Sequence, residues 1–173
     1  MNGRVVELHG AQEIAARVGA LASDISARFG DRELTVLGVL EDGFVFLSDL
    51  LRALRVPSLR TSFVRHEHRS LGGMEDLSFT TPADISGRDV LLVEAVLDTG
   101  VTQEYLLKHL AERGASSVSL CVLLDKSDRR RTQARADWAA FESREDYVFG
   151  YGLGLQERWR ELPFLATFER PER

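Results

Sequence analysis

Apolar residues recur at every third or fourth position over residues 11–29, and this spacing predicts an amphipathic helix. Gly30 follows the last of them, where a glycine commonly ends a helix. Residues 34–40 (LTVLGVL) are almost continuously apolar, which is typical of a strand covered on both faces. After the short loop 41–43, the apolar spacing predicts a second helix from Phe44 to about Leu54.

The same unit of strand, loop and helix recurs in the second half of the chain. Residues 89–96 (DVLLVEAV) predict a buried strand, residues 97–100 a turn, and residues 101–113 a helix that ends at Gly114. Residues 118–124 predict a third buried strand. This alternation favours an α/β fold with a mainly parallel sheet and helices on both faces. Ligands bind beyond the carboxyl ends of such strands, so the two strand-to-helix loops are the first candidates for a site.

The segments outside these units have weaker patterns. Residues 66–88 are polar and contain glycine, and we expect them to form a long loop of the kind that serves as a lid or binding loop. Beyond residue 124 the chain is irregular, with a charged stretch at 125–135, a short apolar piece at 138–141 and the glycine-rich run 147–155. Because no repeat or linker divides the chain, we expect a single domain.

Composition narrows the class of protein further. The 173 residues are 44% hydrophobic and 28% charged, as in ordinary globular domains. The net charge of -5 lacks the basic excess of a general nucleic-acid binder. No apolar run approaches the roughly 18 residues of a membrane helix, and the first residues do not resemble a signal peptide. We therefore expect a soluble cytoplasmic protein without nucleic-acid or membrane partners, in which the lone Cys121 is a core residue.

The stretch 93–102 (VEAVLDTGVT) is the most informative part of the sequence. A buried strand ends there with Glu94 and Asp98, and residues 98–102 lead directly into a predicted helix. The free N–H groups of a helix start, a glycine that permits close approach and the hydroxyls of Thr99 and Thr102 suit a phosphate monoester. The alternative is that Asp98 only caps the helix. Spacing alone leaves both interpretations open.

Three parts of the chain resemble one enzyme family. Residues 90–102 (VLLVEAVLDTGVT) resemble the phosphoribosyl-diphosphate (PRPP) signature of type I phosphoribosyltransferases. Residues 36–54 (VLGVLEDGFVFLSDLLRAL) are similar to the early strand, loop and helix of hypoxanthine-guanine phosphoribosyltransferases. Lys126, the run 147–151 (YVFGY) and Arg160 resemble the purine hood of that branch, in the same order. The resemblance extends over about residues 5–168.

This resemblance implies a fold and an activity. The fold would be that of type I phosphoribosyltransferases, with a mainly parallel twisted sheet flanked by helices. Residues 1–173 would form one domain, with a small hood subdomain built from the N-terminal residues and about 136–173. The activity would be transfer of phosphoribose from PRPP to hypoxanthine or guanine, giving IMP or GMP and pyrophosphate with Mg²⁺ as cofactor. The family also implies a homodimer or homotetramer.

The resemblance also implies roles for individual residues. Glu94 would contact the ribose hydroxyls directly or through Mg²⁺, and Asp98 would accept or donate a proton beside purine N7. The 5′-phosphate would be held by the loop that comprises Asp98, Thr99, Gly100, Val101 and Thr102. The purine would meet the amine of Lys126, the ring of Tyr147 and the backbone of Val148. Pyrophosphate would lie against Glu41, Asp42, Gly43 and Arg160.

Four positions depart from the family pattern within this site. Ala95 replaces the second acid of the acidic pair, Glu41 and Asp42 replace a small or basic pair, and Gly154 replaces an aspartate of the hood. Residues 66–88 also lack the family's Ser-Tyr pair and are shorter, which puts the lid in doubt. A like-charge pair at about 4 Å costs on the order of 4 kcal/mol at an effective dielectric constant near 20, so two loop carboxylates would repel pyrophosphate.

Three interpretations of these departures are open. The protein could bind a purine nucleotide or a protein partner without catalysing transfer, or Glu41 and Asp42 could recruit a cation that restores the site. It could also act on a different base.

Two further features are more typical of solvated surface than of a functional site. The His66-Glu67-His68 triplet has side chains that could bind a metal. The basic run 129–131 could face phosphates.

Overall fold

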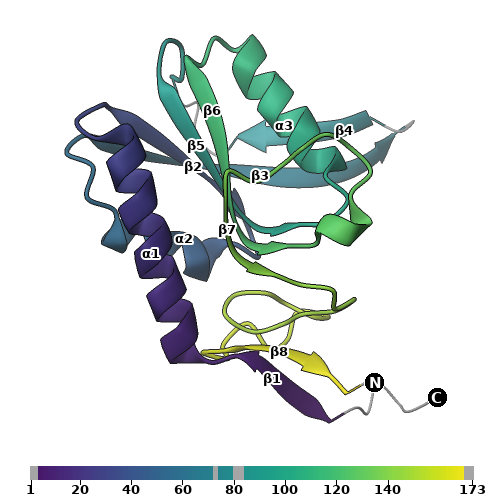
Figure 1. Ribbon diagram of the computed structural model, residues 1–173. Helices are drawn as coiled ribbons and strands as arrows, with labels where there is room; N and C mark the ends of the chain where they lie inside the picture. The colour runs from purple at the N-terminus through teal and green to yellow at the C-terminus, as the bar shows by residue number, and fades with distance from the viewer. Residues whose placement is uncertain (1–3, 72–73, 80–83, 170–173) are drawn as a thin grey trace.

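The computed structural model describes residues 4–71, 74–79 and 84–169, with side chains described outside residues 65–83. Its centre is a six-stranded sheet in the order β4-β3-β2-β5-β6-β7 (Figure 1). The bounds of these strands are β2 Leu34–Leu40, β3 Leu59–Leu71, β4 Met74–Phe79, β5 Asp89–Leu97, β6 Ser117–Asp125 and β7 Trp138–Glu142. All neighbouring strands are parallel except β3 and β4. The predicted α/β fold with a mainly parallel sheet is confirmed.

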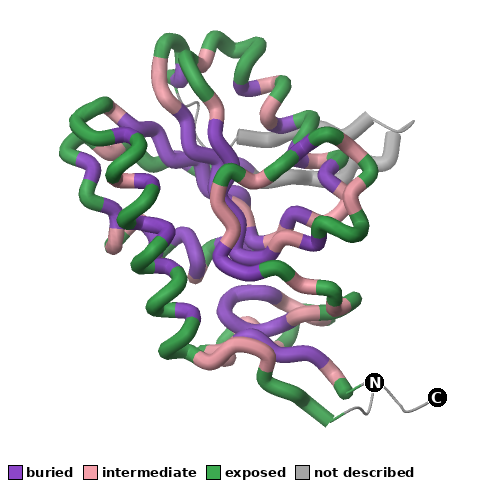
Figure 2. Tube along the Cα trace, in the orientation of Figure 1, coloured by how far each residue is buried: buried purple, intermediate pink, exposed green. Residues whose placement is uncertain are grey.

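Helices cover both faces of the sheet. α1 (Ala11–Phe29) and α2 (Phe44–Ala53) pack on one face, where Phe46 and Leu50 are fully buried. α3 (Val101–Glu112) packs on the opposite face through Leu106 and Leu110. β2, β5 and β6 are buried along most of their length between these layers (Figure 2), which explains their continuous apolar sequences. None of the helices in the described ranges has both the length and the apolarity of a membrane span.

A small subdomain lies below the carboxyl ends of the central strands in Figure 1. Its strands β1 (Val5–His9) and β8 (Leu165–Phe168) pair in antiparallel fashion although they come from opposite ends of the chain. Fully buried Phe149 packs beside Trp159 and Phe168 and gives the subdomain its own apolar contacts. Strand β7, which lies within the range predicted for the hood, belongs to the central sheet.

The prediction of a long loop over residues 66–88 is wrong for most of that segment. β3 continues to Leu71 and pairs with β4 in an antiparallel hairpin, with Val64 opposite Phe79 and His66 opposite Leu77. A strand that extends past the helix-covered part of a sheet can carry polar residues, so it lacks the apolar pattern on which the prediction depended. The side chains of the His66-Glu67-His68 triplet and the region of the expected lid lie outside the described side chains.

Candidate active site

A crevice lies between β2 and β5, where the direction of the chain through the sheet reverses. From β2 the chain crosses to β3 on one side, and from β5 it crosses to β6 on the other. Ligands of open α/β sheets bind at such switch points, beyond the carboxyl ends of the strands. A cavity of about 270 Å³ is found here, lined by residues 39–43 and 94–96.

The loop 98–102, which joins β5 to α3, has the geometry of an anion-binding helix start. Gly100 precedes the first turn of α3 with a left-handed backbone (φ 85°), and no side chain of the described residues caps the helix. The first N–H groups of α3 are therefore not occupied by a capping oxygen. The alternative interpretation, in which Asp98 is the helix cap, is wrong because Gly100 holds that position.

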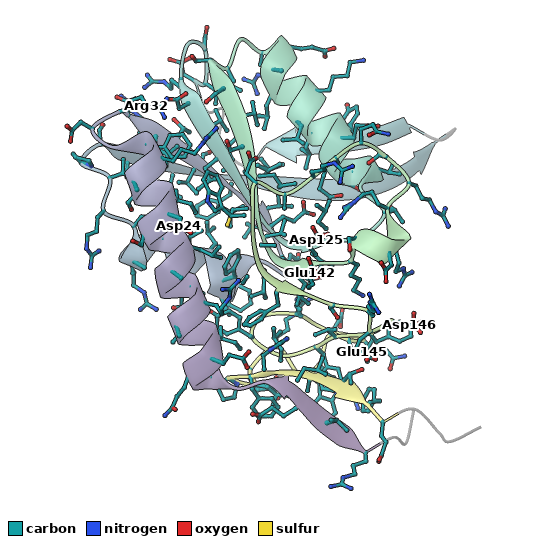
Figure 3. All side chains as sticks on the ribbon, viewed as in Figure 1. Asp24, Arg32, Asp125, Glu142, Glu145 and Asp146 are labelled. Atoms are coloured by element: carbon teal, nitrogen blue, oxygen red, sulfur yellow. The ribbon has the colours of Figure 1, made fainter. Side chains whose placement is uncertain are left out.

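Part of the basic run packs against this loop. The backbone N–H of Arg131 donates to the carbonyl of Thr99 at 2.8 Å. A Cβ at position 100 would lie 2.8 Å from Cδ of Arg130. The guanidinium of Arg130 forms an ion pair with Asp125 at the end of β6, and Figure 3 labels Asp125. Gly100 therefore has two functions here: it adopts a positive φ and it leaves room for the arginine chain.

We expect Gly100→Ala to lower the free energy of unfolding by about 2 kcal/mol, because a side chain at this φ is strained. Its Cβ would also collide with Arg130 and move the loop, which should weaken binding of a nucleoside monophosphate. Gly19→Ala is the matched control, since a Cβ there meets nothing within 4 Å and alanine favours a helix by about 1 kcal/mol. Urea unfolding and ligand titration compare the two variants, and equal stability would contradict the expectation.

Two carboxylate oxygens beside this loop are buried and lack a hydrogen-bond donor among the described residues. They are Oε2 of Glu94 and Oδ1 of Asp98. The latter lies 3.1 Å from Nε of Arg129, in an ion pair without hydrogen-bond geometry. Buried polar atoms in folded proteins nearly always have a partner. Two buried oxygens in one crevice that accept no hydrogen bond, one of them contacted only by the Arg129 ion pair, therefore indicate a place where a ligand, a cation or water supplies further contacts.

The environment of Glu94 disfavours its charge. Burial raises the pKa of Glu94 to about 7, a hydrogen bond from the side chain of Gln103 opposes this rise, and the negative charge of Asp42 adds to it. Gln103 is itself buried on α3 and donates to the carbonyl of Val96 at 3.3 Å. A cation or a hydroxyl donor that reached Glu94 would favour the ionised form.

Lys126 lies beside Asp98 because their strands are neighbours. It directly follows β6, it is almost fully buried, and its Nζ donates to the carbonyl of Asp146 at 2.9 Å. Burial lowers the pKa of Lys126, and the charge of Asp98 opposes that shift. The amine has three N–H donors, of which the contact with Asp146 uses one.

Residues 145–148 connect the sheet to the small subdomain, and Figure 3 labels Glu145 and Asp146 in this connection. Arg129 joins it to the crevice, since its guanidinium lies 3.1 Å from Asp98 and 3.7 Å from Asp146. Tyr147 is 59% exposed, and its backbone carbonyl accepts a hydrogen bond from Thr167 of β8. Val148 packs against the core. The tyrosine ring is thus available for stacking on a flat ligand.

The loop 41–43 lies directly against the end of β5. The peptide bond between Leu40 and Glu41 is cis. A Cβ on Gly43 would lie 3.0 Å from the carbonyl oxygen of Val39 and 3.4 Å from the backbone nitrogen of Ala95. The side chain of Ala95 is buried in the core beneath, so position 95 supplies no polar side chain to the crevice.

Asp42 is paired with Arg160 of the small subdomain. The expectation that both loop carboxylates repel pyrophosphate therefore needs correction for Asp42, whose charge is largely balanced by the guanidinium. Arg160, which was expected to bind pyrophosphate, donates a hydrogen bond to the carboxylate of Asp42 in this structure. The pair connects two segments that are 118 positions apart in the chain.

A magnesium ion would fit this crevice. Among the described side chains, no group of three or more His, Cys, Asp and Glu residues is arranged to hold a metal. Glu94, however, presents one buried oxygen without a donor. Mg²⁺ usually binds through one or two carboxylates together with substrate phosphates and water, so a single protein carboxylate is sufficient.

A larger hollow of about 660 Å³ lies between α1, α2 and residues 160–163. It shares Arg160 with the site just described, but its walls include the apolar side chains of Ile14, Phe44 and Val45. Apart from Arg160, no residue expected to bind phosphate, pyrophosphate or purine lines it. We therefore assign the chemistry to the smaller, acidic crevice.

The structure thus gathers the predicted residues on the loops after β2, β5 and β6 and on residues 146–160. It adds two contacts that the sequence analysis missed, those of Gln103 with Glu94 and of Arg129 with Asp98. The sequence did contain a signal for the contact of Gln103 with Glu94. Gln103 lies on the same inward face of α3 as Leu106 and Leu110, at a position where an apolar residue is usual. The second depends on contacts that no local pattern contains.

This sheet, its switch-point crevice and the uncapped loop after β5 define an α/β protein with a helix start of the kind that binds anions. The family described as "Phosphoribosyl transferase domain" matches residues 5–158. The hypoxanthine-guanine phosphoribosyltransferase of Mycobacterium avium is 32% identical over 168 residues, which are 92% of this chain and 83% of the relative. The hypoxanthine phosphoribosyltransferase of Salmonella typhimurium is 32% identical over 159 residues, 89% of each chain.

Solved structures agree with these sequence comparisons. The crystal structure of a hypoxanthine-guanine phosphoribosyltransferase from Bacillus anthracis superposes with a TM-score of 0.89 at 28% identity, covering 95% of this chain and 98% of the other. A hypoxanthine phosphoribosyltransferase from Trypanosoma cruzi gives the same TM-score at 30% identity. The chain belongs to the phosphoribosyltransferase family, in its hypoxanthine-guanine branch. The resemblance noted from the sequence is confirmed.

Proposed function

We propose that this protein transfers phosphoribose from PRPP to a 6-oxopurine, hypoxanthine or guanine, and releases pyrophosphate with IMP or GMP. The observation that carries the proposal is the pair of buried carboxylate oxygens on Glu94 and Asp98 that accept no hydrogen bond from the described residues, next to the uncapped start of α3. A ribose 5-phosphate placed there would meet donors for its phosphate and acceptors for its hydroxyls. The names of the relatives support the same substrates.

The reaction breaks the bond between C1 of ribose and a pyrophosphate oxygen, forms a bond from C1 to a purine nitrogen, and removes one proton from the base. We assign Asp98 to the proton, because its carboxylate lies beside the loop after β5 and the ion pair with Arg129 holds it in place. The protein otherwise acts by positioning both substrates and by stabilising charge. The phosphate would lie on Thr99, Gly100, Val101 and Thr102.

The purine would lie between the sheet and residues 146–148. Lys126 has N–H donors left for an exocyclic oxygen, Tyr147 offers an exposed ring, and Val148 offers its backbone. When Mg²⁺ is bound it supplies positive charge to the diphosphate and ribose oxygens, and Glu94 is the residue that would hold it. We further propose that the protein forms a homodimer or homotetramer, which sedimentation measurements would test.

A second candidate function is nucleotide binding without transfer. Two observations favour it: position 95 has no carboxylate, and Arg160 is occupied by Asp42. Under this alternative IMP or GMP would bind in the crevice and PRPP would not be consumed. Transfer to another base is the remaining possibility, because Tyr147 and its neighbours define the purine pocket only loosely.

The test is to measure nucleotide and pyrophosphate formed from PRPP with hypoxanthine, guanine, xanthine and adenine in parallel, first with Mg²⁺ and then with EDTA. We expect IMP or GMP with Mg²⁺ and none with EDTA. Turnover with adenine or xanthine alone would overturn the assigned base. Absence of turnover from a folded protein that still binds IMP would favour the binding function, and absence of binding would contradict both.

A further inference from the structure

We propose that Asp42 acts as an internal anion that competes with diphosphate groups for Arg160, and that this competition sets the affinity of the crevice for pyrophosphate and for PRPP. The inference rests on the proposed function for the identity of the diphosphate ligand. The contact itself is a feature of this chain, since Asp42 in the loop after β2 is ion-paired with Arg160 of the small subdomain.

The guanidinium of Arg160 is held in a defined place. Its Nη1 donates to a carboxylate oxygen of Asp42 and to the carbonyl of Gly152, the latter at 2.8 Å. The side chain of Arg160 is 30% exposed and that of Asp42 is 51% exposed, so both remain accessible to a ligand. Asp42 also lines the 270 Å³ cavity. The pair is therefore at the edge of the space that a diphosphate would enter.

Gly154 belongs to the same arrangement. A Cβ at position 154 would lie 2.5 Å from Cζ and 2.7 Å from Nε of Arg160, so the guanidinium fills the space that any side chain there would need. Gly152 also leaves room for this contact, because a Cβ at position 152 would lie 3.0 Å from the carbonyl oxygen of Asp42. Asp42 and Gly154 are thus two parts of one contact with Arg160.

A diphosphate needs the same donors that Asp42 now uses. Its oxygens can bind Arg160 only by sharing or displacing the carboxylate, and a displaced Asp42 would then be an unbalanced negative charge at the cavity wall. Any ligand without a diphosphate, such as IMP, avoids both effects. The contact should therefore weaken binding of pyrophosphate and PRPP selectively and shorten the residence of pyrophosphate after transfer.

Calorimetric titration with inorganic pyrophosphate, at fixed Mg²⁺, tests the proposal on wild type and four variants: Asp42→Asn, Glu41→Gln, Arg160→Gln and the double variant Asp42→Asn/Arg160→Gln. Asp42→Asn should bind pyrophosphate about tenfold to a hundredfold more tightly, the range expected for one charge-assisted hydrogen bond. Its affinity for IMP should stay unchanged. The gain should disappear in the double variant, because it requires the released guanidinium.

Glu41→Gln is the matched control, since it removes the same charge from the same loop without touching the ion pair. A gain in Glu41→Gln equal to that in Asp42→Asn would overturn the proposal in favour of general repulsion. An unchanged affinity in Asp42→Asn, or a gain that persists in the double variant, would overturn it as well. Should Asp42→Asn fail to fold, as judged by its melting temperature, Asp42→Gly provides the same readout.

The outcome separates this inference from the proposed function. If wild type shows no transfer while Asp42→Asn gains pyrophosphate affinity through Arg160, the competition is real and the transferase assignment fails. If wild type catalyses transfer while Asp42→Asn gains nothing, the assignment stands and the competition is rejected.

Discussion

Replacing Asp98 by asparagine is expected to lower the rate of IMP formation by about 10²- to 10⁴-fold, the usual contribution of a group that transfers a proton. Asparagine has the same shape and can still accept a contact from Arg129, but it cannot take a proton from the base. IMP affinity should therefore change little. The loss should fall on kcat, measured at saturating PRPP and hypoxanthine.

Asp128→Asn is the control for this variant. Asp128 is also an aspartate near the crevice, but it pairs with Arg144 on the surface and has no contact with Asp98 among the described residues. Its substitution should leave kcat unchanged. Equal turnover of Asp98→Asn and wild type would remove Asp98 from the proton transfer. A parallel loss of IMP affinity in Asp98→Asn would indicate that the carboxylate only holds the loop.

The regular core of the fold was predictable because its signal is local. The apolar period of residues 11–29 and the continuous apolar runs at 34–40 and 89–96 each correspond to an element within one or two residues. The hairpin β3–β4 and the short strands β1 and β8 were not. The sequence of β4 and of the second half of β3 is mostly polar, and β1 and β8 have only five and four residues, too few to show a clear period. β1 and β8 also pair although almost the whole chain separates them, so no local pattern indicates their pairing.

The candidate site also has a part that the sequence predicts and a part that it does not. The loops after β2 and β5 could be placed from strand positions alone, so residues 41–43 and 97–100 were expected at the site. Lys126 was expected there only through the family resemblance. The ion pair of Asp42 and Arg160 could not, because it depends on how the small subdomain folds back onto the loop after β2. In the sequence, an acid at position 42 and a glycine at position 154 each indicate a loss of function. The structure shows that both residues lie against Arg160.

Glu94 offers the clearest case of a residue whose charge opposes folding. Its pKa rises from 4.5 to about 7, mainly through burial. The folded state therefore binds the proton more tightly than the unfolded state, and stability should fall as the pH rises from about 4.5 to about 7. Above that range the full penalty applies, about 3 kcal/mol for a shift of this size. A glutamine at position 94 avoids the penalty at every pH.

We therefore expect Glu94→Gln to be more stable than wild type by up to about 3 kcal/mol at pH 8 and by less than about 1 kcal/mol at pH 5. Urea unfolding at the two pH values measures the difference. Glu112→Gln serves as control, since Glu112 is an exposed carboxylate paired with Lys108, and its effect should not depend on pH in this way. A stability difference for Glu94→Gln that is equal at both pH values would show that the carboxylate is not strained by burial.

The same variant should lose Mg²⁺-dependent transfer, because glutamine cannot supply the charge that a cation needs. A substitution that stabilises the fold and removes activity identifies a group held in an unfavourable environment for the sake of its ligand. In the free protein Oε2 of Glu94 lacks a donor, and in the complex ribose hydroxyls or Mg²⁺ would satisfy it. Addition of PRPP with Mg²⁺ should therefore raise the melting temperature of wild type more at pH 8 than at pH 5, and should leave that of Glu94→Gln nearly unchanged.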